Sequence, residues 1–515
     1  MSRMLKLAMV ALALVLGLAP SGAEAQKKQV VVGLNQDPDI LDPTLSRTYV
    51  GRIIFTHMCE KLYEIDEKLQ IHPQLAAEMP QYADGGRTMT IKLRPNVKFN
   101  DGSAMTAEAV RFSLDRHINL KGSNRRAELG SVNAVEVVDP LTIRLKLKAP
   151  SAPLLSQLTD RAGMPVSPAA VQKLGDNFGT RPVCVGPWQF AERVAQDRIV
   201  VEKSPHYFDQ GAAKFDRVVF RIIPDDNVRL ANLRSGDLDI VHQVTPTDAA
   251  ALKREGRFDV PGATGIGYNA ITINHRNKTG KTNPPADLGT PLANDPRVRE
   301  ALELSIDREA LVQVVYDGQY TAGCTPIAPI SPFFDSTRKC PTRDVARAKK
   351  LLADAGLPNG YAFELTVVNN PQQRRVGEVI QQMAKEAGFT ITLKPQEFAS
   401  ALNDADAGKH QAFLIGWSGR VDPDGNIYSG QTCKGPLNNH LACDEKIDAL
   451  LDRAREVSEV GQRRGIYREA IDLLAARRSI VYLYHPHYIF AHAKNLKGYK
   501  AVPDGLVRLK GTSWQ

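Results

Sequence analysis

Histidine side chains near the end of the chain come closest, in type and spacing, to a metal-binding or acid–base site. His485, His487 and His492 fall in a stretch whose polar and apolar side chains alternate as in a strand. Alternation sends neighbouring side chains to opposite faces, so it favours packing over a shared metal ion. Residues 422–426 (DPDGN) begin like a calcium loop but lack its third acidic position and its closing glutamate. The sequence therefore predicts no metal and no cofactor.

Motifs for nucleophilic or nucleotide chemistry are absent from the sequence. It contains no Gly-x-Ser-x-Gly, no His-Glu-x-x-His and no Cys-x-x-Cys. Residues 262–267 (GATGIG) do not fit the Gly-x-Gly-x-x-Gly pattern and open no helix. An exported hydrolase of peptides or conjugates is the competing class, and turnover by the pure protein would favour it. The residues favour a binding protein that is not an enzyme.

The N-terminus has the layout of a secretory signal peptide over residues 1–25. Two basic side chains precede an apolar run over residues 7–19, and the small-x-small step AEA follows at residues 23–25. The run is about a dozen residues, short of the roughly 20 that span a bilayer. The first cysteine is Cys59, so no lipid anchor is available at the predicted cleavage point. We expect a soluble mature protein that starts near Gln26.

Length and charge limit the class of the mature protein. About 490 residues follow the signal, more than one hydrophobic core supports, so we expect two or three domains. The formal charge of +9, from 66 basic and 57 acidic residues, is spread along the chain without a run of five basic residues. Nucleic-acid binding is therefore not expected. The mild positive charge suits anionic solutes or is a solvated surface.

Six cysteines in an exported chain indicate disulfides. Cys324 and Cys340 bracket one loop rich in turn-forming residues, and Cys433 and Cys443 bracket another. Each bridge would close a short loop and stabilise the fold by about 2 to 3 kcal/mol. Cys59 and Cys184 remain, and the sequence leaves open whether they pair or stay as buried thiols.

The order of predicted elements favours an α/β protein. Residues 29–34 form a predicted buried strand, followed by a turn-rich loop and a helix over residues 49–61. Further strands are predicted at residues 87–94, 141–148, 197–203, 215–223, 363–368, 390–393, 412–416 and 480–484. A helix is predicted from residue 106, with Thr106 as its cap, and further helices are predicted at residues 296–316, 344–355, 374–388, 444–454 and 461–477. The later half therefore predicts helices packed on a largely parallel sheet.

Several segments match a known family in order and spacing. The clearest are residues 75–79 (LAAEM), 87–102 (RTMTIKLRPNVKFNDG) and 106–115 (TAEAVRFSLD). Three more are residues 185–190 (VGPWQF), 295–308 (DPRVREALELSIDR) and 348–356 (AKKLLADAG). The chain resembles the family 5 extracellular solute-binding proteins, the dipeptide-, oligopeptide-, nickel- and glutathione-binding group, from about residue 29 to residue 500.

The resemblance implies a two-lobed periplasmic binding protein fold (type II, cluster C) with an additional subdomain in the first lobe. The expected limits are 26–71, 186–272 and 487–515 for the first lobe, 72–185 for the inserted subdomain and 273–486 for the second lobe. The resemblance also implies a periplasmic monomer that captures a peptide or a small polar or anionic solute between its lobes. The loaded receptor would deliver the solute to an inner-membrane ABC permease and its ATPases.

The family's ligand-binding loop corresponds to residues 415–428 (IGWSGRVDPDGNIY). In peptide-binding relatives this loop supplies an aspartate for the ligand's amino group, and here Arg420 stands at that place. A guanidinium fork suits a carboxylate or phosphate, so Arg420 would hold an anionic group beside Trp417 as an apolar or stacking wall. Alternatively Arg420 pairs with Asp422 or Asp424 and only holds the loop together. Trp417, Arg420 and Asp422 are candidates, and peptide and non-peptide anion both stay open as ligands.

Other candidate ligand residues follow predicted strands. Asn369 and Asn370 come at the C-terminal end of a strand, the edge of an α/β sheet where ligands bind. Three more, Asn35, Arg47 and Tyr49, lie in or just after the loop that follows the first strand, and Arg161 lies in residues 159–163 (TDRAG). Asn35, Arg47 and Tyr49 each have an equally good interpretation as loop or helix-cap scaffolding, and Arg161 is a similar candidate.

Overall fold

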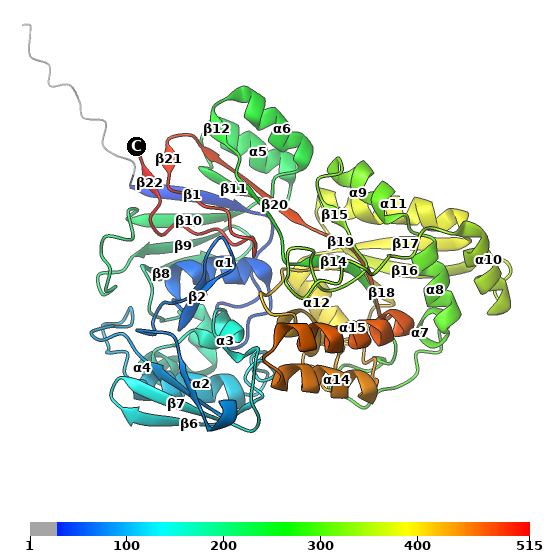
Figure 1. The fold of residues 1–515 in the computed structure, drawn as a ribbon. Helices are drawn as coiled ribbons and strands as arrows, with labels where there is room; N and C mark the ends of the chain where they lie inside the picture. Colours follow the sequence, from blue (N-terminus) through cyan, green and yellow to red (C-terminus); the bar gives the residue numbers. More distant parts are fainter. Residues whose placement is uncertain (1–27) are drawn as a thin grey trace, which may run out of the picture.

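The computed structural model describes residues 28–515, and Figure 1 shows them as two lobes side by side, with a smaller sheet-and-helix unit beside the first lobe. The predicted signal peptide, residues 1–25, lies outside the described residues. Within residues 28–515, none of the helices has the length and apolar character that crossing a membrane requires. The α/β class predicted from the sequence is confirmed.

The first lobe is built on an eight-stranded sheet that the chain enters from several distant segments. Its strands lie in the order β12 (Phe258–Asp259), β20 (His487–Ala493), β11 (Ile240–His242), β1 (Gln29–Leu34), β10 (Arg217–Ile222), β9 (Arg198–Lys203) and β8 (Trp188–Val194), with β13 (Gly262–Thr264) paired to β20. The predicted strand at residues 29–34 is β1, which runs parallel to both β10 and β11 in the centre of the sheet.

Helices cover both faces of this sheet. On one face, α1 (Tyr49–Met58) packs its buried apolar side chains against β1 and β8. On the other face lie α5 (Asp226–Ser235) and α6 (Pro246–Glu255), whose leucines pack against the alternate side chains of β1 and β10. The alternation of side chains along a strand explains why one strand serves both cores.

The second lobe contains a six-stranded sheet. Its strands lie in the order β15 (Thr321–Ala322), β19 (Ile480–His485), β14 (Tyr268–Ile273), β18 (Ala412–Trp417), β16 (Tyr361–Val368) and β17 (Phe389–Gln396). The prediction of a largely parallel sheet was wrong, because only the β16–β17 and β16–β18 pairs are parallel. The sheet is mixed because β14, with which the chain enters the lobe, lies between β18 and β19 and runs antiparallel to both.

The helices of the second lobe pack on both faces of its sheet and beside it. They are α7 (Pro291–Asn294), α8 (Pro296–Leu304), α9 (Arg308–Tyr316), α10 (Val345–Asp354), α11 (Pro371–Glu386), α12 (Phe398–Asp406), α13 (Asp424–Gln431), α14 (Glu445–Glu456) and α15 (Val460–Arg477). The single helix predicted over residues 296–316 was wrong. Two helices, α8 and α9, occupy this range. Asp307 caps the start of α9, because its side chain accepts a hydrogen bond from the backbone N of Ala310 (2.9 Å).

The smaller unit contains a four-stranded antiparallel sheet covered by α2 (Ala107–Asn119). Its strands are β4 (Gln81–Ala83), β5 (Thr88–Lys92), β7 (Thr142–Leu147) and β6 (Val132–Asp139). Thr106 caps α2 as expected, by accepting from the backbone N of Ala109 at 3.3 Å. The short helices α3 (Leu154–Gln157), η2 (Arg161–Gly163) and α4 (Pro168–Leu174) follow the sheet. Where each lobe begins and ends along the chain stays a prediction.

Three disulfides link the six cysteines. The Cys324–Cys340 and Cys433–Cys443 bridges confirm the two pairs predicted from local spacing. The third bridge, Cys59–Cys184, joins the C-terminal end of α1 to the segment before β8 across 125 residues, so the pair that the sequence left open is bonded.

Buried histidines make the fold sensitive to acid. Burial lowers the pKa of these side chains from 6.5 to about 4 at His57, His117, His410 and His485 and to about 3 at His242 and His275. A seventh, His440, has its pKa held well below 6.5 by burial and by nearby Arg477. The folded protein therefore keeps these rings neutral at a pH where the unfolded chain protonates them.

We expect the free energy of unfolding to fall as the pH is lowered from about 6.5 towards 4. In that window the unfolded chain binds protons at these histidines and the folded chain does not, so each one contributes a slope of up to about 1.4 kcal/mol per pH unit. Urea unfolding at pH 7, 6 and 5 measures the slope.

The variant His410→Leu should reduce this slope by about the share of one histidine. Neither ring nitrogen of His410 has a hydrogen-bond partner in the described structure, so leucine loses no polar contact there. The exposed, uncharged Gln382 provides the control, because Gln382→Leu removes no titratable group and should leave the slope unchanged. An unaltered slope in His410→Leu would show that burial does not hold this histidine neutral.

Candidate ligand-binding site

A cavity lies between the two lobes and has two neighbouring compartments with empty volumes of about 1020 and 780 Å³, part of each open to solvent. The charged compartment is lined by Arg47, Asp406 and Arg420 and otherwise mainly by apolar side chains such as Phe398. The amide–tyrosine compartment is lined by asparagine, glutamine and tyrosine side chains. Both compartments share a wall, formed by Tyr49, Tyr268, Phe398, Gly416, Trp417 and Ser418.

The end of β18 and the loop after it contribute Gly416, Trp417 and Ser418 to this wall, and hydrogen bonds within this segment hold it in place. Asn426 Oδ1 accepts hydrogen bonds from the indole Nε1 of Trp417 (3.1 Å) and from the backbone N of Arg420 (2.7 Å). Gly419 has φ +78°, and a Cβ there would lie 2.4 Å from the carbonyl oxygen of Ile266. The Trp417 ring and the start of the Arg420 side chain are therefore held in place before any ligand arrives.

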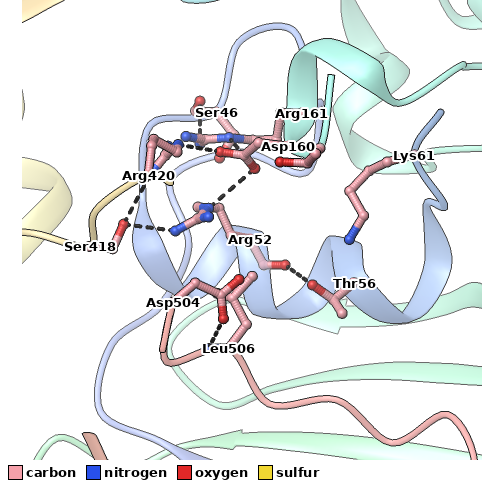
Figure 2. A network of polar contacts seen from close by, with 12 residues as sticks. Ser46, Arg52, Thr56, Lys61, Asp160, Arg161, Ser418, Arg420, Asp504 and Leu506 are labelled. Atoms are coloured by element: carbon pink, nitrogen blue, oxygen red, sulfur yellow. Dashed lines mark hydrogen bonds and ion pairs between the residues drawn. The ribbon is translucent and has the colours of Figure 1, made fainter. Parts of the chain in front are cut away.

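The partner of Arg420 is a carboxylate of the smaller unit beside the first lobe. Its Nε lies 2.6 Å from Asp160 Oδ2, and the other oxygen of Asp160 accepts from Arg52 Nε at 3.2 Å. The Nε of Arg161 lies 3.8 Å from the same Oδ1. Figure 2 shows these three guanidiniums converging on Asp160 from α1, from η2 and from the loop after β18.

The alternative that Arg420 pairs with Asp422 or Asp424 was wrong, because these aspartates have arginines of the second lobe as partners. Both oxygens of Asp422 contact Arg463 on α15, at 2.7 and 2.8 Å. Asp424 accepts from Arg455 at 2.6 and 3.0 Å. Asp422 lines a narrow side cavity together with Asp160 and Arg420. Both carboxylates of the loop therefore pair with arginines of the second lobe, and Arg420 pairs with Asp160 on the other side of the cavity.

The buried cluster around Asp160 contains more positively charged side chains than carboxylates, and this shifts the pKa values of its members. The pKa of Asp160 is well below its usual range, because Arg420, Arg52 and Arg161 outweigh the opposing effect of burial. Burial, followed by the repulsion of Arg52, lowers the pKa of Arg420 to about 10, and burial with the repulsion of Arg125 lowers that of Arg161 well below its usual value. Against the effect of burial, Asp160 and Asp504 raise the pKa of Arg52, so the charge that is least compensated lies at Arg420 and Arg161, and a second anion beside Arg420 would be favoured.

Arg47 and Tyr49 both line the cavity, and the polar atoms of both side chains already contact other residues of the protein. Arg47 forms an ion pair with Asp406 of α12, and its Nη2 donates to Asn403 Oδ1 at 3.1 Å, so it joins the two lobes. The hydroxyl of Tyr49 donates to the carbonyl oxygen of Gly505 and lies 3.2 Å from His242 Nε2.

The predicted asparagines occupy different places. Asn35 lines the amide–tyrosine compartment, where its Nδ2 donates to Gln243 Oε1 at 2.8 Å. Asn370 lines the same compartment and caps α11 by accepting from the backbone N of Gln373 at 2.8 Å. Asn369 is exposed and lines neither compartment. Arg161 also lines neither, and its Nη1 donates to the carbonyl oxygen of Ser46 at 2.7 Å.

Several cavity residues were missed from the sequence. Asp160 had as its only signal its position beside Arg161, and Asn426 gave none beyond its place in the binding loop. The amides Gln243, Asn269 and Gln373 come from three different segments, so no local pattern links them.

The histidines near the end of the chain lie apart from one another. His485 is buried, and its Nδ1 lies 2.8 Å from the carbonyl oxygen of Gly267. His492 is also buried, with Nδ1 3.0 Å from the carbonyl oxygen of Ala493. Within residues 28–515 no three histidine, cysteine, aspartate or glutamate side chains are grouped so that they could hold a metal ion.

We expect Asp160→Asn to lower the free energy of unfolding by about 3 kcal/mol or more. Within residues 28–515, Asp160 is the only carboxylate in ion-pair contact with Arg52 and Arg161, and breaking a buried ion pair from one side typically costs about 3 to 5 kcal/mol. Urea unfolding at pH 7 measures the loss.

Asp259→Asn is the matched control, because the Asp259 carboxylate is half exposed and lies 3.9 Å from an exposed lysine, Lys497. Exposed pairs of this kind contribute about 0 to 1 kcal/mol. Equal losses in the two variants would mean that Asp160 does not balance the buried arginines.

Known proteins resemble this chain over almost its whole length. The glutathione-binding protein GsiB of Salmonella paratyphi A is 29% identical over 505 residues, which is 95% of this chain and 96% of that protein. Among solved structures, AgaA from A. tumefacien R10 in complex with agropinic acid has a TM-score of 0.83 and 26% identity, over 95% of this chain and 99% of that chain. DppA from Helicobacter pylori in complex with the peptide STSA has a TM-score of 0.86 and 22% identity, over 95% and 98%, and shares the two-lobed periplasmic binding protein fold. Residues 70–438 match the model of the bacterial extracellular solute-binding proteins, family 5 Middle, and the chain therefore belongs to this family of solute receptors.

Proposed function

We propose that the chain is the periplasmic receptor of an ABC importer for a small solute whose anionic group is held by Arg420. The observation that carries this proposal is the sharing of one carboxylate, Asp160, by three buried guanidiniums beside the cavity. Taking unbalanced charge out of water is costly, and a carboxylate or phosphate of the ligand would offset that cost. A ligand's free amino group needs a carboxylate as its partner, and at this place it would find the positively charged Arg420 instead.

The named ligands of similar proteins are compatible with this proposal. GsiB is named for glutathione, and AgaA was solved with agropinic acid. Because DppA was solved with a peptide, the family resemblance alone does not separate peptides from other solutes. The preference for an anionic solute therefore rests on Arg420 and its surroundings, and glutathione, itself a peptide with a free amino group, supports only the anionic character.

Closure around the ligand would follow from contacts that join the lobes. Arg420 reaches Asp160, the Nη1 of Arg52 donates to Ser418 Oγ at 3.0 Å, and Arg47 pairs with Asp406. A ligand that touches both sides binds the closed form better than the open one and shifts the population towards it. The permease and its ATPases would then recognise the closed form.

Further parts of the proposal concern the mature protein. We propose that a signal peptide is removed after residue 25, that the receptor acts as a monomer, and that it releases its solute chemically unchanged. The ligand recovered after incubation with the pure protein should therefore have an unaltered mass.

We expect Arg420→Ala to weaken binding of anionic solutes by about 10- to 100-fold, which is the loss of one charge-assisted contact. The mature chain, residues 26–515, is unfolded and refolded to remove carried-over solute and is then titrated calorimetrically with organic acids, amino-acid conjugates and peptides. Arg420→Lys keeps the charge but loses the fork, so an intermediate loss is expected.

Arg374→Ala is the matched control, since Arg374 is an exposed arginine on α11 outside both compartments. It should leave every affinity unchanged. If Arg420→Ala binds all anions as well as the wild-type protein, or if free peptides bind best and independently of Arg420, the proposed ligand class is wrong.

A further inference from the structure

The amide–tyrosine compartment contains no acidic or basic lining residue. Seven of its lining side chains are asparagine or glutamine and six are tyrosine. Burial raises the pKa of Tyr316 and Tyr320, with nearby tyrosines adding to it, so both hydroxyls stay neutral. A ligand group that carries a full charge would find no counter-ion here, so the compartment favours an uncharged one.

Two amide oxygens in this lining lack hydrogen-bond donors. Asn269 Oδ1 and Gln373 Oε1 are buried and have no partner among the described residues. Asn269 lies on β14 opposite Gly416 of β18, and a Cβ at Gly416 would come within 3.3 Å of Asn269 Nδ2. Buried acceptors are nearly always paired in folded proteins, so both oxygens are suited to receive donors from a bound molecule.

Flat aromatic surfaces accompany these acceptors. The rings of Tyr316 and Tyr320 stack with centroids 3.8 Å apart and planes 6° from parallel. Trp417 stands at the boundary, since it lines both compartments, and the guanidinium carbon of Arg420 lies 5.1 Å from its ring centroid. Neutral acceptors, neutral hydroxyls and aromatic faces together suit hydroxyl groups on a carbon skeleton, which donate, accept and present C–H faces.

We propose that the amide–tyrosine compartment binds the uncharged, polyhydroxylated part of a ligand whose anionic end lies at Arg420. This inference rests on the proposed function, because it takes the position of the anionic end from it. The ligand class is then a sugar acid or a sugar–amino-acid conjugate. The shared wall at Trp417 and Ser418 lets one molecule reach both compartments.

The test compares matched ligands by calorimetry on the refolded mature chain. Gluconate is paired with hexanoate, which has the same carbon count and charge but no hydroxyls, and fructosyl-glutamate is paired with glutamate. We expect the hydroxylated member of at least one pair to bind at least tenfold more tightly. Gln373→Met and Asn269→Ala should each reduce that affinity about fivefold or more and leave the affinity of the hydroxyl-free member unchanged.

Gln382→Met is the control, because Gln382 is exposed on the same helix, α11, and lies outside the compartment. It should change nothing. The inference is overturned if both members of each pair bind equally, or if the dipeptide Ala-Glu outcompetes all of them and is the ligand that Gln373→Met weakens. A failure of the proposed function is a different result: the affinity for anions would then be the same in Arg420→Ala as in the wild-type protein.

Discussion

One buried carboxylate, Asp160, ties together the parts of the chain that surround the cavity. Arg52 reaches it from α1 of the first lobe, Arg161 from η2, and Arg420 from the second lobe. Buried charges of this kind stabilise a fold only when their partners are in place, since an unpaired one costs several kcal/mol. The relative position of the three segments is therefore coupled to the charge balance at Asp160.

The distribution of the other charges explains why Arg420 crosses to the opposite lobe. The aspartates nearest to it in sequence are held by Arg463 and Arg455, on the two helices that close the second lobe. The carboxylate that pairs with Arg420 stands on the facing side of the cavity, so the second lobe presents a positively charged side chain there.

Local sequence patterns predicted those features that depend on nearby residues. The strand at residues 29–34, the cap at Thr106 and the two short-range disulfides all arise from neighbours along the chain. The Cys59–Cys184 bridge and the Arg420–Asp160 pair join distant segments, and no periodicity or spacing encodes such contacts. No strand was predicted where β14 lies, and its antiparallel direction follows from how the chain passes between the lobes and not from a local pattern. The family resemblance supplied the binding loop, but a charge reversal at Arg420 can be interpreted only when its partner is known.

Some hydrogen bonds between the two sides of the molecule lie outside the cavity and do not depend on a ligand. Gln157 Nε2 donates to Asp424 Oδ2 at 2.7 Å, the backbone N of Ala152 to the carbonyl oxygen of Arg455 at 2.8 Å, and Arg455 Nη2 to the carbonyl oxygen of Ala127 at 3.1 Å. These contacts favour closure and need no ligand. In the proposed function, closure also brings Arg420 next to Arg52 and Arg161, and this repulsion between like charges opposes it. An anion at Arg420 relieves the repulsion in the closed form alone, and that difference in affinity is what lets a solute control the position of the lobes.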